Sequence, residues 1–282
     1  MVEGSLRSAP VGGGRPSKRG LVCHIAGRRR RTGITIGVSC PAAGGDAARR
    51  PRGVCVHCGR RAPTPGRGSG SGVTIPFDAL QQFNGPGVFN PWAERDPLDI
   101  EGGGPAARLG RLRRHFDVDP LLILIGEAAG YQGCHFSGMA FTNERLMLEG
   151  RIPRIAVDGR FTARPRPWCE PSATVVWGAL HAHGVADRTV LWNSFAWHPY
   201  KDGNPYSNRA PTRTELEAGR AVLNGVLGAF AGACVVAVGQ VAGRTLRSLG
   251  REPAAVVRHP SMGGANEFRA GLGALVAGLR RR

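Results

Sequence analysis

The stretch Leu121-Leu122-Ile123-Leu124-Ile125-Gly126-Glu127-Ala128-Ala129-Gly130 contains the pattern that decides the fold. Its first five residues form an unbroken apolar run, and Gly126 ends that run. A short continuous run of this kind is typical of a strand buried on both faces, as in a parallel sheet. The sequence therefore predicts a buried strand that leads into a Gly-rich loop.

Similar apolar runs recur downstream, and helical segments separate them. Further strands are expected at residues 189–192, 234–238 and 254–257. Helices are expected at residues 108–116, 142–149, 172–183, 212–230, 241–249 and 267–279. Thr212 and Glu215 have the spacing of a capping box at the start of one of them. This alternation indicates an α/β fold: a three-layer α/β/α arrangement around a central, mainly parallel sheet of four strands.

Three of the expected strands are followed by loops that carry polar side chains together with glycine or proline. The loops contain residues 126–130, the segment that begins at Asn193, and Arg258-His259-Pro260-Ser261-Met262. Ligands of open α/β sheets bind beyond the carboxyl ends of the strands. We therefore expect the three loops to meet at one edge of the sheet and to form the functional site.

The order and spacing of these motifs resemble the uracil-DNA glycosylase superfamily, from residue 121 to the C-terminus. Residues 126–130 look like the first motif of that family, often Gly-Glu-Ala-Pro-Gly, with Ala129 in place of the proline. Phe141 matches the aromatic residue that stacks on the extruded base, and Asn193 resembles the amide that reads its edge. His259-Pro260-Ser261 is similar to the last motif, which stabilises the departing base.

The resemblance implies a monofunctional DNA glycosylase in base excision repair. Its substrate would be DNA containing a deaminated base, first of all uracil, which must leave the base stack before its glycosidic bond is hydrolysed by water. No lysine stands in residues 126–131, 193–199 or 258–264 to form a Schiff base, so no strand-cutting activity is expected. The residues implied to bind the base are Gly126, Ala128, Gly130, Phe141 and Asn193.

Catalysis needs a donor for the base anion and a carboxylate near the sugar and the attacking water. His259 is the expected donor. Glu127 is the first candidate for the carboxylate and Glu144 the second, since branches of the family place this acid differently. Taken alone, each of these residues has an ordinary structural interpretation, and only their joint order favours catalysis.

Residues on two of the loops are expected to contact DNA. Lys201, Asn208 and Arg209 lie in a polar segment after Asn193 and are candidates for phosphate or backbone contacts. Ser261 and Met262 follow His259, and the apolar Met262 is a candidate wedge for the space left by an extruded nucleotide.

The net charge of +18 is concentrated at the N-terminus, where residues 1–72 hold 14 Lys and Arg against two acids. This Gly- and Arg-rich segment is expected to be a disordered basic tail, and residues 73–282 the glycosylase-like domain. A DNA-binding tail, a transit-peptide-like leader and a start codon set too far upstream all fit such a segment. Plain disorder or the upstream start is favoured.

The seven cysteines are an odd number, and no secretory signal precedes them, so a bacterial-type cytoplasm is the expected compartment. Cys55 and Cys58 have the spacing of half a metal site, but a single pair does not complete one, so no metal or other cofactor is expected. No apolar run is long enough for a membrane span, and a monomer is expected. Two other functions stay open: a damaged-DNA binding protein with little catalysis, and a hydrolase of free nucleosides.

Overall fold

A computed structural model describes residues 75–281 of the chain. The expected basic tail of residues 1–72 and the Cys55–Cys58 pair lie outside the described residues. No helix within residues 75–281 is both long and apolar enough to span a bilayer.

A four-stranded parallel sheet forms the centre of the fold, in the order β3-β2-β5-β6. Its strands are β2 (Leu122–Ala128), β3 (Thr189–Phe195), β5 (Cys234–Val238) and β6 (Ala255–Val257). The four apolar runs of the sequence coincide with these strands, which confirms the expected sheet. In the register of β2 and β3, Gly126 is the partner of Asn193, so the first motif and the expected base-reading amide are adjacent across the sheet.

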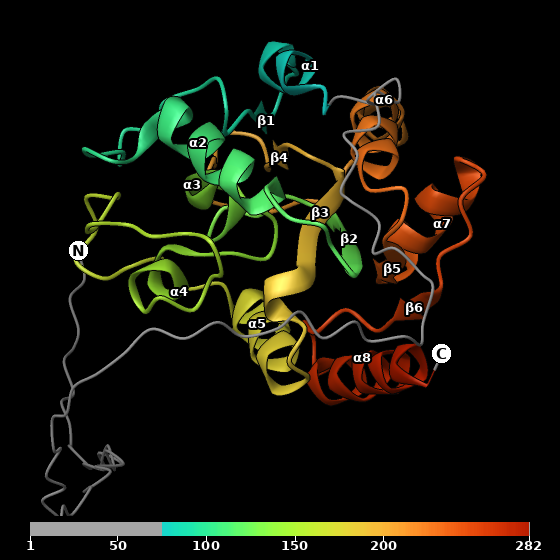
Figure 1. The fold of residues 1–282 in the computed structure, drawn as a ribbon. Coiled ribbons are helices and arrows are strands. Elements are labelled where there is room, and N and C mark those ends of the chain that lie inside the picture. The colour runs from blue at the N-terminus through green and yellow to red at the C-terminus, as the bar shows by residue number, and fades with distance from the viewer. Residues whose placement is uncertain (1–74, 282) are drawn as a thin grey trace, which may run out of the picture. The chain divides into compact units, whose positions relative to one another are not determined.

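Helices cover both faces of this sheet (Figure 1). One layer contains α5 (Pro171–Ala182) and α8 (Ala265–Arg280), which pack against each other. The other contains α6 (Arg213–Ala229) and α7 (Gln240–Ser248). This arrangement confirms the three-layer α/β/α prediction. The predicted capping box is present at the start of α6, where Thr212 and Glu215 bond each other's backbone N–H.

The remaining elements surround one edge of the sheet. They are α1 (Phe77–Gln82), β1 (Val88–Phe89), α2 (Gly104–Phe116), α3 (Cys134–Ser137), α4 (Glu144–Leu148), the 3-10 helix η1 (Ala186–Arg188) and β4 (His198–Pro199). His115 of α2 accepts a 2.9 Å hydrogen bond from the Leu191 N–H, so a side chain satisfies a backbone donor of edge strand β3. The antiparallel pair β1 and β4 was not predicted, because two-residue strands leave no periodic signal in a sequence.

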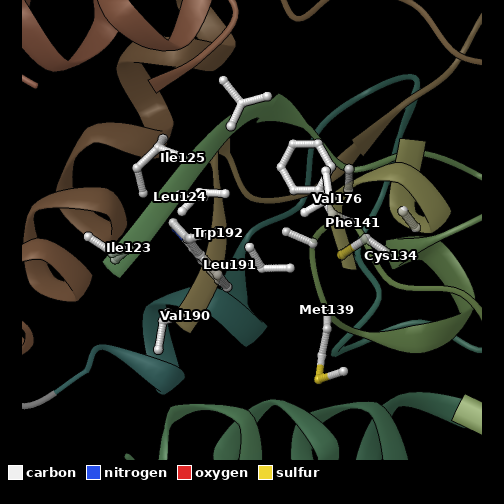
Figure 2. Close-up of a cluster of buried hydrophobic side chains, with 14 of the residues drawn as sticks. Ile123, Leu124, Ile125, Cys134, Met139, Phe141, Val176, Val190, Leu191 and Trp192 are labelled. Atoms are coloured by element: carbon white, nitrogen blue, oxygen red, sulfur yellow. The ribbon is translucent and has the colours of Figure 1, made fainter. Parts of the chain in front are cut away.

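The hydrophobic core reaches from the sheet to the expected site. Residues 122–125 of β2 are completely buried. Figure 2 shows that Cys134, Phe141 and Val176 belong to the same apolar cluster as these strand residues. Burying each large aliphatic side chain contributes about 1.5–3 kcal/mol to folding. The wall of the site is thus part of the core rather than a loop laid over it.

Candidate active site

A cavity of about 630 Å³ lies at the carboxyl ends of β2 and β3. All three expected loops contribute to its lining. The expected site residues that line it are Glu127, Ala128, Gly130, Phe141, Asn193, Asn208, Arg209, His259, Ser261 and Met262. The chain therefore brings together segments separated by more than a hundred residues, as the strand-end positions predicted.

Gly126 lies directly beneath two of these side chains and leaves no room for a Cβ. An added Cβ would stand 2.6 Å from the Asn193 side chain and 2.6 Å from the ring of Phe141. Phe141 has a φ of 48°, in the left-handed region that non-glycine residues adopt rarely. The close approach and the unusual backbone together place the ring at the end of β2.

The segment that carries Phe141 is held by buried groups of the N-terminal part. Arg111 donates to the carbonyls of Phe136 and Ser137 at 3.0 and 2.9 Å. Arg108 is completely buried, ion-paired with Asp99, and its side chain lies against Gly138. Arg111 thus holds the backbone of α3, and Arg108 packs against the turn after it, so the segment that leads to Phe141 is anchored in the core.

Asn193 is 4% exposed and presents its amide at the cavity. In the amide orientation that satisfies both atoms, the oxygen accepts from the Ala129 N–H at 3.2 Å and the nitrogen donates to the Trp192 carbonyl at 3.3 Å. An asparagine amide has two N–H donors and two lone pairs, so one of each is left for a ligand. This pair matches a base edge that has a carbonyl beside an N–H.

The hydrogen bonds of His259 determine which ring nitrogen carries its proton. Its Nδ1 lies 3.2 Å from the Ser261 backbone nitrogen, which donates to it, and 2.7 Å from the Ser261 hydroxyl. A backbone N–H can only donate, so Nδ1 is the acceptor and Nε2 carries the hydrogen. Burial lowers the pKa of His259, and the neighbouring Arg258 lowers it further. His259 is thus a neutral imidazole with an Nε2–H available to a ligand.

Glu127 is the carboxylate of the cavity that the sequence predicted first. It lies at the end of β2, is partly buried, and no described residue donates a hydrogen bond to its side chain. Burial raises the pKa of Glu127 above its ordinary value, while the positive charge of Arg244 acts in the opposite direction. Its oxygens are therefore free to bind a water molecule.

Glu144 is not among the residues that line the cavity, and its oxygens are occupied. They accept hydrogen bonds from the Arg160 guanidinium, the Thr162 hydroxyl, and the backbone N–H groups of Phe161, Thr162 and Trp168. Burial raises the pKa of this carboxyl, but the bonds from Arg160 and Thr162 outweigh burial and lower it. The expectation that Glu144 is an alternative catalytic acid does not fit this placement, since the side chain anchors residues 160–168 instead.

The polar segment after Asn193 folds back on the protein through Arg209. Its guanidinium donates to both carboxylate oxygens of Glu215, at 2.6 and 2.8 Å, and to the Tyr200 and Gly87 carbonyls. These bonds occupy the donors that a phosphate would use, so Arg209 fixes the loop. Asn208 accepts from the Tyr131 N–H at 3.0 Å. Lys201 is exposed and has no ion-pair partner among the described residues.

Met262 extends from the rim of the cavity and is 91% exposed, the largest exposed fraction among the exposed large apolar residues of the described part. Its φ is 50°, so the loop after His259 holds this side chain outward at some backbone cost.

Sequence reasoning missed Glu170, which also lines the cavity. It stands immediately before Pro171 at the start of α5, and a Glu before a proline is an ordinary helix start. No local pattern separates such a residue from a solvated one. Within residues 75–281, no three His, Cys, Asp or Glu side chains gather into a set that could hold a metal ion.

Comparison with known proteins gives one family and one fold. The model of the uracil DNA glycosylase superfamily matches residues 114–275. The crystal structure of wild-type SMUG2 from Pedobacter heparinus is similar at a TM-score of 0.50 and 14% sequence identity, over 73% of this chain and 96% of that chain. No curated protein matches the sequence.

Proposed function

The chain belongs to the uracil DNA glycosylase superfamily, and from that premise we propose that it is a monofunctional glycosylase that excises uracil or another deaminated base from DNA. The observation that carries this proposal is the convergence of Glu127, Phe141, Asn193 and His259 on one cavity. Phe141 supplies a stacking face and Asn193 reads the edge of the base. His259 supplies a hydrogen-bond donor and Glu127 a free carboxylate.

The extruded base would occupy the cavity against the ring of Phe141. Its carbonyl and N–H would pair with the unused donor and acceptor of Asn193. Aromatic stacking and two hydrogen bonds to a base edge are the contacts by which enzymes hold a nucleotide outside the duplex. A cavity of about 630 Å³ is large enough for one nucleobase.

In the chemical step, the bond between the sugar C1′ and the base nitrogen breaks, and its electron pair leaves with the base. The Nε2–H of His259 donates to the base anion, while the ionised Glu127 stabilises the positive charge on the sugar. The oxygen of a water molecule forms the new bond to C1′, and its proton passes to Glu127. Preorganised donors of this kind act where charge develops, which is why they accelerate the reaction.

On the protein surface, Lys201 would bind a backbone phosphate, and Ser261 and Met262 would contact the strand beside the extruded nucleotide. Lys201 is exposed in the segment that leads to Asn208, and Met262 is exposed at the rim of the cavity, which supports these roles. We expect the protein to act as a monomer in a bacterial-type cytoplasm.

The test is excision from oligonucleotides that contain a single uracil, in single and double strands, followed by alkali. We expect strand breaks at uracil after alkali only, because a monofunctional glycosylase leaves an intact abasic strand. Glu127→Gln, Asn193→Ala and His259→Ala should each lower the single-turnover rate about a hundredfold or more. Glu101→Gln, an exposed carboxyl outside the cavity, is the matched control.

Retention of uracil-containing DNA without breaks would contradict the proposal and indicate a damage-binding protein. Turnover of free nucleosides by a protein inert towards DNA would contradict it in favour of a nucleoside hydrolase.

A further inference from the structure

A second carboxyl lines the same cavity as Glu127. Glu170 lines the cavity together with Cys134 and the first residues of α5. Its backbone occupies the position before α5, but its side chain does not cap that helix. The carboxyl of Glu170 therefore forms no hydrogen bond with the first turn of α5.

The position of Glu170 is fixed by its backbone and by a close approach to a glycine. Its carbonyl accepts from the Asn143 side-chain amide at 3.2 Å. Its carboxyl lies against Gly133, where an added Cβ would stand 1.8 Å from Oε2. Any larger residue at position 133 would occupy the space of the carboxyl, so the chain leaves room for Glu170 here.

No described residue forms a hydrogen bond or an ion pair with the carboxyl of Glu170. Glu144, in contrast, is satisfied by Arg160 and by backbone donors. Glu127 also has no hydrogen-bond donor among the described residues, so the difference between Glu127 and Glu170 is the nearby positive charge of Arg244. A half-buried carboxyl that faces a cavity without a protein partner costs free energy unless a ligand or water supplies one or the group stays neutral.

Burial raises the pKa of Glu170 to about 7, and no cation offsets this effect. The thiol of Cys134 also lines the cavity, and its pKa is raised by burial and further by the charge of Glu170. The other titratable groups at the cavity are Glu127, Arg209 and His259, on three further segments. Around neutral pH a large share of Glu170 is therefore a carboxylic acid, which donates through its O–H, whereas a carboxylate only accepts.

We propose that Glu170 is a specificity-determining residue of the base pocket. Its carboxyl, which lines the cavity without a partner among the described residues, donates a hydrogen bond to an oxo group of the extruded base. This inference rests on the proposed glycosylase function. Deaminated bases carry an oxo group where the undamaged base carries an amino group. A neutral acid favours the oxo group, and an ionised one would repel it.

The experiment compares wild type, Glu170→Gln and Glu170→Ala by single-turnover excision of uracil and of hypoxanthine between pH 5.5 and 8.5. In the wild type, the rate should fall by up to about tenfold for each pH unit above 7, as the donor form is lost. The carboxamide of Glu170→Gln keeps a donor that does not titrate, so its alkaline decline should disappear while its rate at pH 6 stays within a fewfold of wild type. Glu170→Ala should be slower about 10- to 100-fold at pH 6, because it leaves the oxo group without its donor.

Glu101→Gln should keep the wild-type profile, since that residue is exposed and does not line the cavity. The thermal midpoint of each variant checks folding, and if Glu170→Ala unfolds, the profile of Glu170→Gln decides alone. An unchanged alkaline decline in Glu170→Gln would overturn the inference while leaving the glycosylase proposal intact. A wild type that excises neither base would overturn both.

Discussion

Replacing Gly126 by alanine tests the geometry of the pocket most directly. The new methyl group would stand 2.6 Å from the Phe141 ring and 2.6 Å from the Asn193 side chain, where ordinary contacts begin near 3.4 Å. Both neighbours are almost completely buried, so neither can swing into solvent. The ring or the amide must therefore shift by about 1 Å, a displacement that can cost on the order of a hundredfold in rate.

The same overlap costs about 1–3 kcal/mol of folding free energy, as for other overpacked sites. For a domain of this size that lowers the Tm by about 2–4 °C for each kcal/mol. The assay is single-turnover excision of uracil, with the thermal midpoint measured on the same preparation. We expect a folded protein whose rate is about a hundredfold lower.

Gly178→Ala is the matched control, because a Cβ at this position of α5 meets no atom within 4 Å. Alanine has a higher helical propensity than glycine, so Gly178→Ala should raise stability slightly and leave the excision rate unchanged. If Gly126→Ala excised uracil within threefold of wild type, the tight arrangement of Gly126, Phe141 and Asn193 would not be what positions the base.

Four further substitutions separate structural from functional residues. Glu144→Gln should lower the free energy of unfolding by about 2–4 kcal/mol at pH 7 with little change in the excision rate per folded molecule, measured by urea unfolding. The pKa of Glu144 is lowered in the folded state. Its contribution to the free energy of unfolding is therefore present above the pKa of the unfolded state and is lost as the pH falls through the pKa of the folded state. Below neutral pH, the stability of Glu144→Gln should accordingly depend less on pH than that of wild type. Lys201→Ala should reduce the slope of log DNA affinity against log salt concentration by about one, and a slope equal to that of wild type would exclude a phosphate contact. Arg209→Ala should instead lower the Tm, because it removes the ion pair with Glu215. Met262→Ala should weaken binding to uracil-containing duplex several-fold with an unchanged Tm, and a loss of stability instead would contradict a wedge role.

The parallel sheet could be predicted from the sequence because each strand contains a short continuous run of mainly apolar residues. The strand-end rule predicts Asn193 and His259 at one edge of the sheet, and both line the cavity. The predicted first strand ended at residue 125, whereas β2 continues to Ala128, because backbone pairing with β3 does not require apolar side chains.

The sequence could not predict which carboxylates are hydrogen-bonded and which face the cavity without a partner, because the residues around them come from distant segments. Glu144 follows Phe141 by three residues, yet residues 160–168 fold over it and satisfy its oxygens. Glu170 has no motif around it and reaches the cavity only through the packing of α5 beside Gly133. Distinguishing a satisfied acid from an unpaired one needs the long-range contacts, which a single sequence does not contain.

The adjacency of Gly126 and Asn193 in the β2–β3 register has a consequence for how the protein could be re-engineered or diversify. The distance between these two positions is set by backbone pairing within the core, so it should not change when the loops at the rim are replaced. The surface segments around Lys201 and Met262 could then be exchanged for those of other glycosylases without disturbing the frame that holds the base. Loop grafting would then change the substrate range and the preference for single or double strands, while Gly126 and Asn193 kept their positions in the pocket.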